Sequence, residues 1–195
     1  MDVRTNTFCS SGMHLPNGSY VTFGGNGAVG PFGSLGSQLN PGGYSGAWDS
    51  TIQDFDGALS IRILNPCRSS DSFDSSACQW YDNPSVLSMK KRRWYSAAEA
   101  TGEGRVLIIG GFANGGYVNR NYPNVDPAYQ GGGAEPTYEY YPPSSAPLQN
   151  FTFLIQTSGL NAYAHTFLMP SGKMFVQANL STGEVFFDRS IGPDY

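Results

Sequence analysis

The sequence predicts an all-β fold, more narrowly part of a β-propeller, and two observations carry this prediction. The first is composition, because the 195 residues include 25 Gly and 13 Pro but only 13% charged residues. Many turn formers and few charges favour short strands over long solvent-exposed helices. The second is a pattern that occurs three times along the chain, in which a turn containing Gly leads into an apolar strand.

The repeated pattern occupies residues 15–25, 101–111 and 169–179. Its fourth position is Gly in every copy, at Gly18, Gly104 and Gly172. A Gly there suits a hairpin turn that needs positive φ, and the apolar residues that follow suit a strand buried on both faces. The first two copies end in Gly-Gly, which allows the backbones of converging strands to approach closely.

Further strands are predicted at residues 48–55, 59–64, 136–141 and 151–156, which gives about four strands per unit. The turn glycines lie further apart than the roughly 50 residues of a kelch blade. Insertions at residues 27–46, 68–77 and 114–133 account for the excess length. Four-stranded units with Gly-Gly at a strand end are typical of a kelch-like β-propeller, although composition alone leaves a two-sheet sandwich open.

Closed propellers have about 4–8 blades, whereas this chain holds two whole units and the opening strands of a third. We therefore expect residues 1–195 to be a partial β-propeller domain and a fragment of a larger protein. The first blade is predicted at residues 1–67, the second at residues 79–143 and the start of the third at residues 150–195.

Charge and hydropathy exclude two classes of partner. The formal net charge is −4, and the basic cluster at residues 90–93 is too short to track a phosphate backbone. We expect that cluster to be a solvated turn before a strand, and no nucleic acid to bind. No apolar run approaches the roughly 20 residues that cross a bilayer, so we expect no membrane partner either.

The cysteines point to an oxidising compartment. Cys67 and Cys78 bracket a loop rich in Ser and Asp that would be poorly ordered without a covalent crosslink, so we predict a disulfide between them. Closing this loop stabilises the fold by roughly 2–3 kcal/mol and indicates an extracellular location. Since the first residues have neither a charged n-region nor an apolar h-region, we expect any secretion signal to lie upstream of this chain.

Two residues stand out for chemistry. Cys9 lies on the strand that we predict to lead into the first unit, and Tyr95 lies at the corresponding point of the second unit. Because the first strand of each blade lines the central channel, equivalent positions on adjacent blades bring side chains together. From the residues alone, Cys9 could equally be a small buried hydrophobe and Tyr95 a core aromatic.

Three segments resemble the glyoxal oxidase and galactose oxidase group of copper-radical oxidases. They are Phe-Cys-Ser-Ser-Gly at residues 8–12, Arg-Trp-Tyr at 93–95 with Val-Leu-Ile-Ile-Gly-Gly at 106–111, and Pro-Thr-Tyr-Glu-Tyr-Tyr-Pro-Pro at 136–143. Their order and approximate spacing match that group across nearly the whole chain. The form Arg-Trp-Tyr is more similar to glyoxal oxidase than to galactose oxidase.

The resemblance implies a seven-bladed propeller, of which this chain holds about two and a half blades. It also implies that Cys9 is joined by a thioether to the ring of Tyr95, whose oxygen binds copper and which is oxidised to a radical. The cofactors are then copper and a protein-derived Cys-Tyr radical. The remaining ligands, a second Tyr and two His, are expected outside this chain, because His14 and His165 match neither family histidine and are interpreted as structural.

The implied activity is extracellular oxidation of an aldehyde or α-hydroxycarbonyl, with reduction of O₂ to H₂O₂, by a protein that is a monomer when complete. We expect the chain by itself to be inactive. Three alternatives stay open: a kelch-type binding module in which Cys9 and Tyr95 only pack, a galactose oxidase-like alcohol oxidase, and a partial product with an exposed blade edge. The insertions at 27–46 and 114–133 could shape a substrate entrance or cover blade ends.

Overall fold

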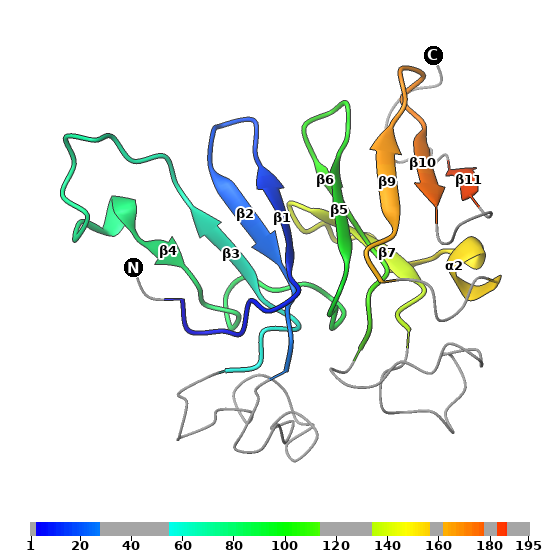
Figure 1. The fold of residues 1–195 in the computed structure, drawn as a ribbon, viewed down its shortest axis with the longest axis horizontal. Helices are drawn as coiled ribbons and strands as arrows, with labels where there is room; N and C mark the ends of the chain where they lie inside the picture. The colour runs from blue at the N-terminus through cyan, green and yellow to red at the C-terminus, as the bar shows by residue number, and fades with distance from the viewer. Residues whose placement is uncertain (1–2, 28–54, 114–133, 157–161, 178–182, 187–195) are drawn as a thin grey trace.

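The computed structural model describes residues 3–27, 55–113, 134–156, 162–177 and 183–186. Within these ranges the protein is all β, apart from one turn of α-helix and a short 3₁₀-helix. Three antiparallel sheets lie side by side in chain order, the first blue to cyan, the second green to yellow and the third orange to red (Figure 1). The described ranges hold no helix long and apolar enough to cross a membrane.

The first sheet has the order β1-β2-β3-β4, and the second has the order β5-β6-β7-β8. The strands of the first are β1 (Ser11–His14), β2 (Tyr20–Phe23), β3 (Ile61–Leu64) and β4 (Trp80–Tyr81). Those of the second are β5 (Ala97–Ala100), β6 (Val106–Ile109), β7 (Thr137–Tyr141) and β8 (Gln149–Asn150). The first sheet therefore extends past residue 67 to Tyr81, and the second extends past residue 143 to Asn150.

The third sheet has the order β11-β10-β9 and contains β9 (His165–Leu168), β10 (Met174–Gln177) and β11 (Gly183–Phe186). In all three sheets the repeated pattern forms the hairpin into the second strand. Its turn glycines Gly18, Gly104 and Gly172 have φ of 85°, 78° and 78°. These values confirm the predicted left-handed turns, which a residue with a Cβ would adopt only with strain.

The Gly-Gly pairs also lie where backbones approach closely. A Cβ on Gly24 would lie 2.0 Å from the Arg93 carbonyl oxygen, and one on Gly25 would lie 2.0 Å from the Asn6 carbonyl oxygen. Hydrogen bonds join the same groups, since the Gly25 N–H donates to the Arg93 carbonyl over 3.1 Å. The first sheet is therefore held against the segment that leads into the second sheet.

Strand β6 is buried on both faces, as its unbroken apolar sequence predicts. Val106 and Ile108 pack with Val21 and Phe23 of the first sheet. The alternate residues of β6, Leu107 and Ile109, belong to a second cluster that includes Met174 and Val176 of the third sheet. Each sheet is thus covered by its neighbour, and residues that alternate along one strand serve two cores.

The strand predicted at residues 151–156 is wrong, because Thr152–Gln156 form the α-helix α2. The alternation of Phe151 and Phe153 suggests a strand, but Leu154 breaks it. Phe151 and Leu154 are three residues apart and are both buried in the cluster between the second and third sheets. One helical turn places both side chains there, and the Leu154 N–H donates to the Phe151 carbonyl over 3.0 Å.

Other predicted segments fall mainly outside the described residues. Of the strand expected at 48–55, only Phe55 is described, and it forms an isolated parallel bridge with Thr5. The insertion expected at 114–133 lies outside the described ranges, as does nearly all of the one expected at 27–46. The predicted strands at 59–64 and 136–141 correspond to β3 and β7.

Candidate active site

The first strands of the three sheets lie next to one another, since β5 contacts both β1 and β9. Cys9 lies in a turn two residues before β1, and Tyr95 lies two residues before β5. The placement of Cys9 on a strand was therefore wrong, although the two positions are equivalent in successive sheets. Both residues have left-handed backbones, with φ of 60° at Cys9 and 61° at Tyr95. This conformation strains an L-residue.

The two turns are hydrogen-bonded to each other. The Tyr95 N–H donates to the Cys9 carbonyl over 3.1 Å, and the hydroxyls of Ser11 and Ser96 are hydrogen-bonded at 3.0 Å. The side chains meet as well, because a hydrogen bond between the Tyr95 hydroxyl and the Cys9 thiol raises the pKa of Tyr95, as does burial. Cys9 is a free, half-buried cysteine, so a thiol and a phenol lie in direct contact.

Aromatic rings surround Tyr95. The ring centroids of Trp94, Tyr163 and Phe112 lie 4.4, 4.9 and 6.5 Å from that of Tyr95, all edge to face. Reasoning from the sequence missed Tyr163. The signal was present, because Cys9, Tyr95 and Tyr163 each lie nine residues before the turn Gly of their unit. Burial, together with charge on Cys9 and a hydrogen bond with it, raises the pKa of Tyr163 to about 12.

A buried arginine holds the turn of Tyr95 in place. Arg93 is 0% exposed, and its Nε donates to Glu139 Oε1 over 3.0 Å. Its Nη1 donates to the carbonyls of Gly110 and Thr137, each over 2.9 Å. The prediction of a solvated turn at residues 90–93 is therefore wrong for Arg93, because a carboxylate on β7 and the second sheet's own carbonyls replace water around the guanidinium.

A second buried arginine, Arg62 on β3, fixes the segment that leads to Cys9. Its Nε donates to Thr5 Oγ1 over 2.5 Å and its Nη2 to the Asn6 carbonyl over 3.0 Å. Asp82 lies 3.8 Å from the Arg62 Nε and accepts the Thr5 N–H over 2.8 Å. The only sequence signal was a charged residue between Ile61 and Ile63, in an otherwise apolar strand.

An open hollow of about 420 Å³ runs along β1, β5 and β9 beside these turns. Tyr163, Glu99 and His165 are among its lining residues. Burial raises the pKa of Glu99 above its ordinary value, while an N–H from Ala100 opposes this shift. His165 is exposed on β9, and His14 on β1 packs its ring edge on Tyr20 with centroids 5.1 Å apart.

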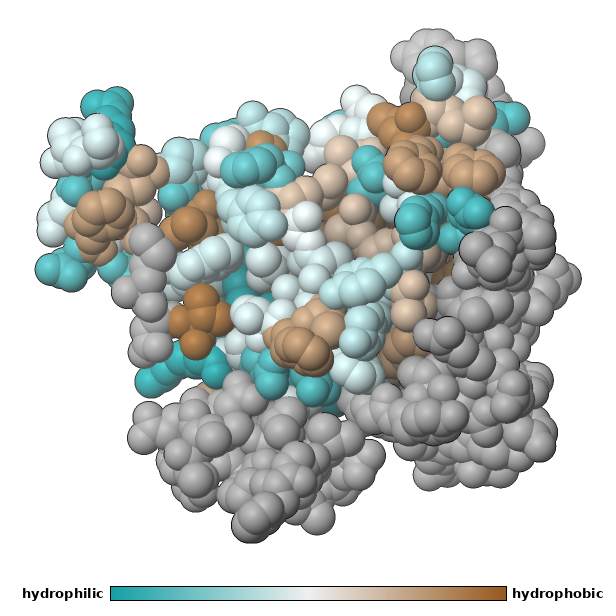
Figure 2. Space-filling model, viewed as in Figure 1, coloured by the Kyte–Doolittle hydropathy of each residue, from teal (hydrophilic) through white to brown (hydrophobic). Residues whose placement is uncertain are grey.

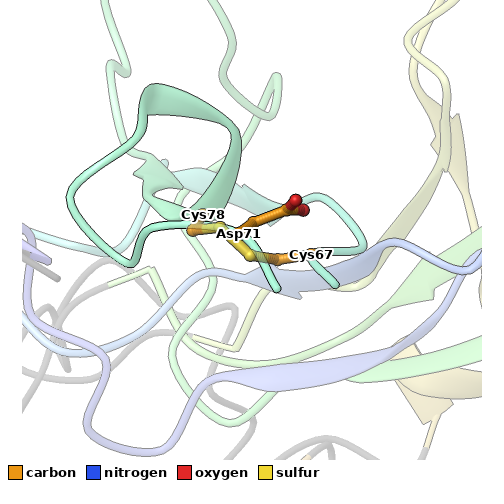
Figure 3. Close-up of side chains that lie close together, drawn as sticks. All are labelled: Cys67, Asp71 and Cys78. Atoms are coloured by element: carbon orange, nitrogen blue, oxygen red, sulfur yellow. A yellow bond between two sulfur atoms is a disulfide. The ribbon is translucent and has the colours of Figure 1, made fainter. Parts of the chain in front are cut away.

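Cys67 and Cys78 form a disulfide with their Cα atoms 5.3 Å apart, as the sequence predicts. With Asp71 they are the one group of three His, Cys, Asp or Glu residues, among those described, whose ligand atoms lie close enough to share a metal (Figure 3). A cysteine binds a metal as a thiolate. Neither Cys67 nor Cys78 is a thiolate, because their sulfurs are joined to each other. Asp71 accepts the Arg68 N–H over 2.8 Å and so stabilises the loop.

Apolar side chains reach solvent on the third sheet. Phe167 is 56% exposed and Leu168 is 37% exposed, both on β9. Figure 2 shows hydrophobic surface over this strand, at the upper right. The two residues lie on opposite faces of β9. Phe167 pairs with Phe175, on the face opposite to Met174 and Val176, which pack toward the second sheet.

The chain is similar in sequence to two known proteins, one of which is named as an oxidase. It is 25% identical over 182 residues to "Aldehyde oxidase GLOX" of Vitis pseudoreticulata, a match that covers 92% of this chain and 24% of that protein. It is also 26% identical over 113 residues to a "WSC domain-containing protein" of Arthroderma benhamiae (strain ATCC MYA-4681 / CBS 112371), covering 57% of this chain and 9% of that protein. No protein-family model matches the chain.

The fold is similar to that of a solved structure described as "Novel fungal alcohol oxidase with catalytic diversity among the AA5 family, in complex with copper". The TM-score is 0.51 at 16% sequence identity, over 87% of this chain and 27% of that one. This chain thus spans about a quarter of the length of both oxidases. Sequence and fold together relate the chain to the copper-radical oxidases of the glyoxal oxidase type.

Proposed function

We propose that this chain forms part of an extracellular copper-radical oxidase and supplies its redox cofactor, a thioether between Cys9 and Tyr95. The observation that carries the proposal is the direct contact of the Cys9 thiol with the Tyr95 hydroxyl, on equivalent turns of adjacent sheets. A second observation supports it, because Cys67 and Cys78 are joined in a disulfide, which is typical of secreted proteins.

The chain's own residues have distinct roles in this proposal. Tyr95 provides a phenol oxygen, a ligand type that suits Cu(II), and copper bound there would supply a one-electron redox partner. Cys9 provides the sulfur substituent that delocalises an unpaired electron on the Tyr95 ring. Arg93 and Arg62, both 0% exposed, hold the two turns through hydrogen bonds of their guanidinium groups. Neither arginine needs to touch a substrate for this role.

The reaction that fits this cofactor is a two-electron oxidation. A hydrated aldehyde loses two hydrogens to give a carboxylic acid, and O₂ gains them to give H₂O₂. An alcohol would lose two hydrogens to give an aldehyde, with the same product from O₂. The plant relative's name favours an aldehyde as the substrate. We propose an α-hydroxycarbonyl as the other substrate class of the same activity. The fungal relative of similar fold is named an alcohol oxidase, which makes a galactose oxidase-like activity the second candidate.

We further propose that the three sheets are about two and a half blades of a seven-bladed, kelch-like propeller, with the remaining copper ligands supplied by later blades. The side-by-side sheets support this, as does the quarter of the relatives' length that the chain spans. The exposed Phe167 on β9 lies on the face of the third sheet opposite to the second sheet, and it suits a face that a further blade covers. We expect the isolated chain to release no peroxide.

The first test is peptide mass spectrometry of the full-length protein after exposure to copper and air. We expect the Cys9 peptide and the Tyr95 peptide to appear as one species, two hydrogens lighter than their sum. Peroxide release from aldehydes, α-hydroxycarbonyls and primary alcohols then separates the substrate classes. If Cys9 instead alkylates freely and Tyr95 is unmodified, the oxidase proposal is wrong and a kelch-type binding module is the better interpretation.

A further inference from the structure

Three non-Gly residues have positive φ in the described part of the chain, and all three occupy the same position in their sheets. They are Cys9, Tyr95 and Tyr163, with φ of 60°, 61° and 47°. Each lies two residues before the first strand of its sheet. A left-handed backbone strains an L-residue, and such strain gathers at functional sites. Tyr163 therefore shares the strained conformation of the two proposed cofactor residues.

The three turns form one hydrogen-bonded series. The Tyr95 N–H donates to the Cys9 carbonyl over 3.1 Å, and the Tyr163 N–H donates to the Tyr95 carbonyl over 2.8 Å. The three left-handed residues are thus linked through their backbones, Cys9 to Tyr95 and Tyr95 to Tyr163. A displacement of the Tyr163 backbone would therefore disturb the hydrogen bond that holds the Tyr95 carbonyl.

The Tyr163 side chain touches both groups that the thioether would join. Its ring packs edge to face on the Tyr95 ring, with centroids 4.9 Å apart and an interplanar angle of 73°. Its hydroxyl is hydrogen-bonded to the Cys9 thiol. The Tyr95 hydroxyl is hydrogen-bonded to the same thiol, so both phenols interact with the sulfur, and Tyr163 also packs against the ring to which the sulfur would bond.

We propose that Tyr163 is a positioning residue that holds the Cys9 thiol against the Tyr95 ring while the thioether forms, an inference that rests on the proposed function. In that step the Cys9 S–H bond and one C–H bond of the Tyr95 ring break, and a bond forms between sulfur and carbon. Two protons and two electrons pass to O₂, which becomes H₂O₂. Tyr163 itself is unchanged by the step.

The test measures how fast the crosslink forms in the full-length protein, purified without copper and then exposed to copper and air. Tyr163→Asn and Tyr163→Gly remove the ring, and both residues tolerate the left-handed backbone. Tyr163→Phe keeps the ring but loses the hydroxyl contact. Tyr81→Phe is the matched control, because Tyr81 and Tyr163 are 40% and 41% exposed and Tyr81 lies on β4, at the far edge of the first sheet.

We expect the ring-deleted variants to form the Cys9–Tyr95 crosslink about tenfold more slowly, the rate equivalent of one lost aromatic contact. Tyr163→Phe should be about threefold slower, and Tyr81→Phe should match the wild type. Unfolding midpoints of the copper-free proteins identify the variants that fold, so that a slower rate in a folded variant reports position rather than stability. If neither ring-deleted variant folds, the crosslinking rate of Tyr163→Phe decides whether Tyr163 has the proposed role.

Four results would count against these proposals, and they are distinguishable. A wild-type protein that forms no crosslink overturns the proposed function itself. A wild-type protein that crosslinks, beside a folded ring-deleted variant within twofold of its rate, overturns only the role of Tyr163. The same holds if Tyr163→Phe is the deciding variant and matches the wild type. Mass spectra that show Cys9 joined to Tyr163 instead of Tyr95 overturn both proposals, because the proposed cofactor joins Cys9 to Tyr95.

Discussion

The buried ion pair of Arg93 and Glu139 should contribute strongly to stability, and Glu139→Ala tests this. Glu139 Oε1 accepts from Arg93 Nε over 3.0 Å, and Oε2 accepts the Lys90 N–H over 2.7 Å. Removing the carboxylate leaves a guanidinium that is 0% exposed without its counter-charge. Breaking such a pair costs about 3–5 kcal/mol. Because Arg93 keeps its bonds to Gly110 and Thr137, we expect the lower end, about 3 kcal/mol.

Urea-induced unfolding of the oxidised protein measures this loss. With an m-value of about 2 kcal/mol/M, a loss of about 3 kcal/mol lowers the midpoint by about 1.5 M. Lys91→Ala is the control, because the Lys91 Nζ lies 3.9 Å from Glu135 and the Lys91 side chain is 48% exposed. The Glu135 side chain is only 9% exposed, but solvent reaches the Lys91 end of the pair, so we expect a loss near the 0–1 kcal/mol typical of exposed pairs, about 1 kcal/mol. Equal midpoints for Glu139→Ala and Lys91→Ala would refute the reasoning.

Three further perturbations have defined outcomes. Gly25→Ala should destabilise by about 2 kcal/mol or more, because its Cβ would lie 2.0 Å from a carbonyl oxygen at a φ of 133°. Gly102→Ala, with nothing within 4 Å, should stay within about 0.5 kcal/mol in the same urea titration. Replacing Cys67 and Cys78 together with Ala should lower the unfolding free energy by about 3 kcal/mol, and an unchanged midpoint would contradict this. Glu99→Gln should stabilise at pH 7, because burial raises the folded-state pKa of Glu99 and so makes its ionised form unfavourable. That advantage should vanish in thermal melts as the pH falls below the ordinary value of 4.5.

Local pattern predicted much of the fold, because it rests on interactions between residues close in the chain. The turn glycines and the apolar runs after them define the hairpins in all three sheets. The loop between Cys67 and Cys78 is short and polar enough for its disulfide to be inferred. The equivalent positions of Cys9 and Tyr95 followed from the repeat and from the family resemblance. Their chemical roles stay predictions.

Tertiary packing decided the features that depend on residues distant in the chain. Leu154 turns inward on a helix because the space between the second and third sheets has to be filled. Arg93 is buried because a carboxylate 46 residues away lies within reach of its guanidinium, and a basic run in the sequence does not reveal that partner. Tyr163 joins Cys9 and Tyr95 only because β9 lies beside β5. The sequence by itself thus determined the repeating unit, through propensities that act within a few residues. The neighbours of each unit, and with them the surroundings of the thiol and phenol, were decided by the packing of sheet on sheet.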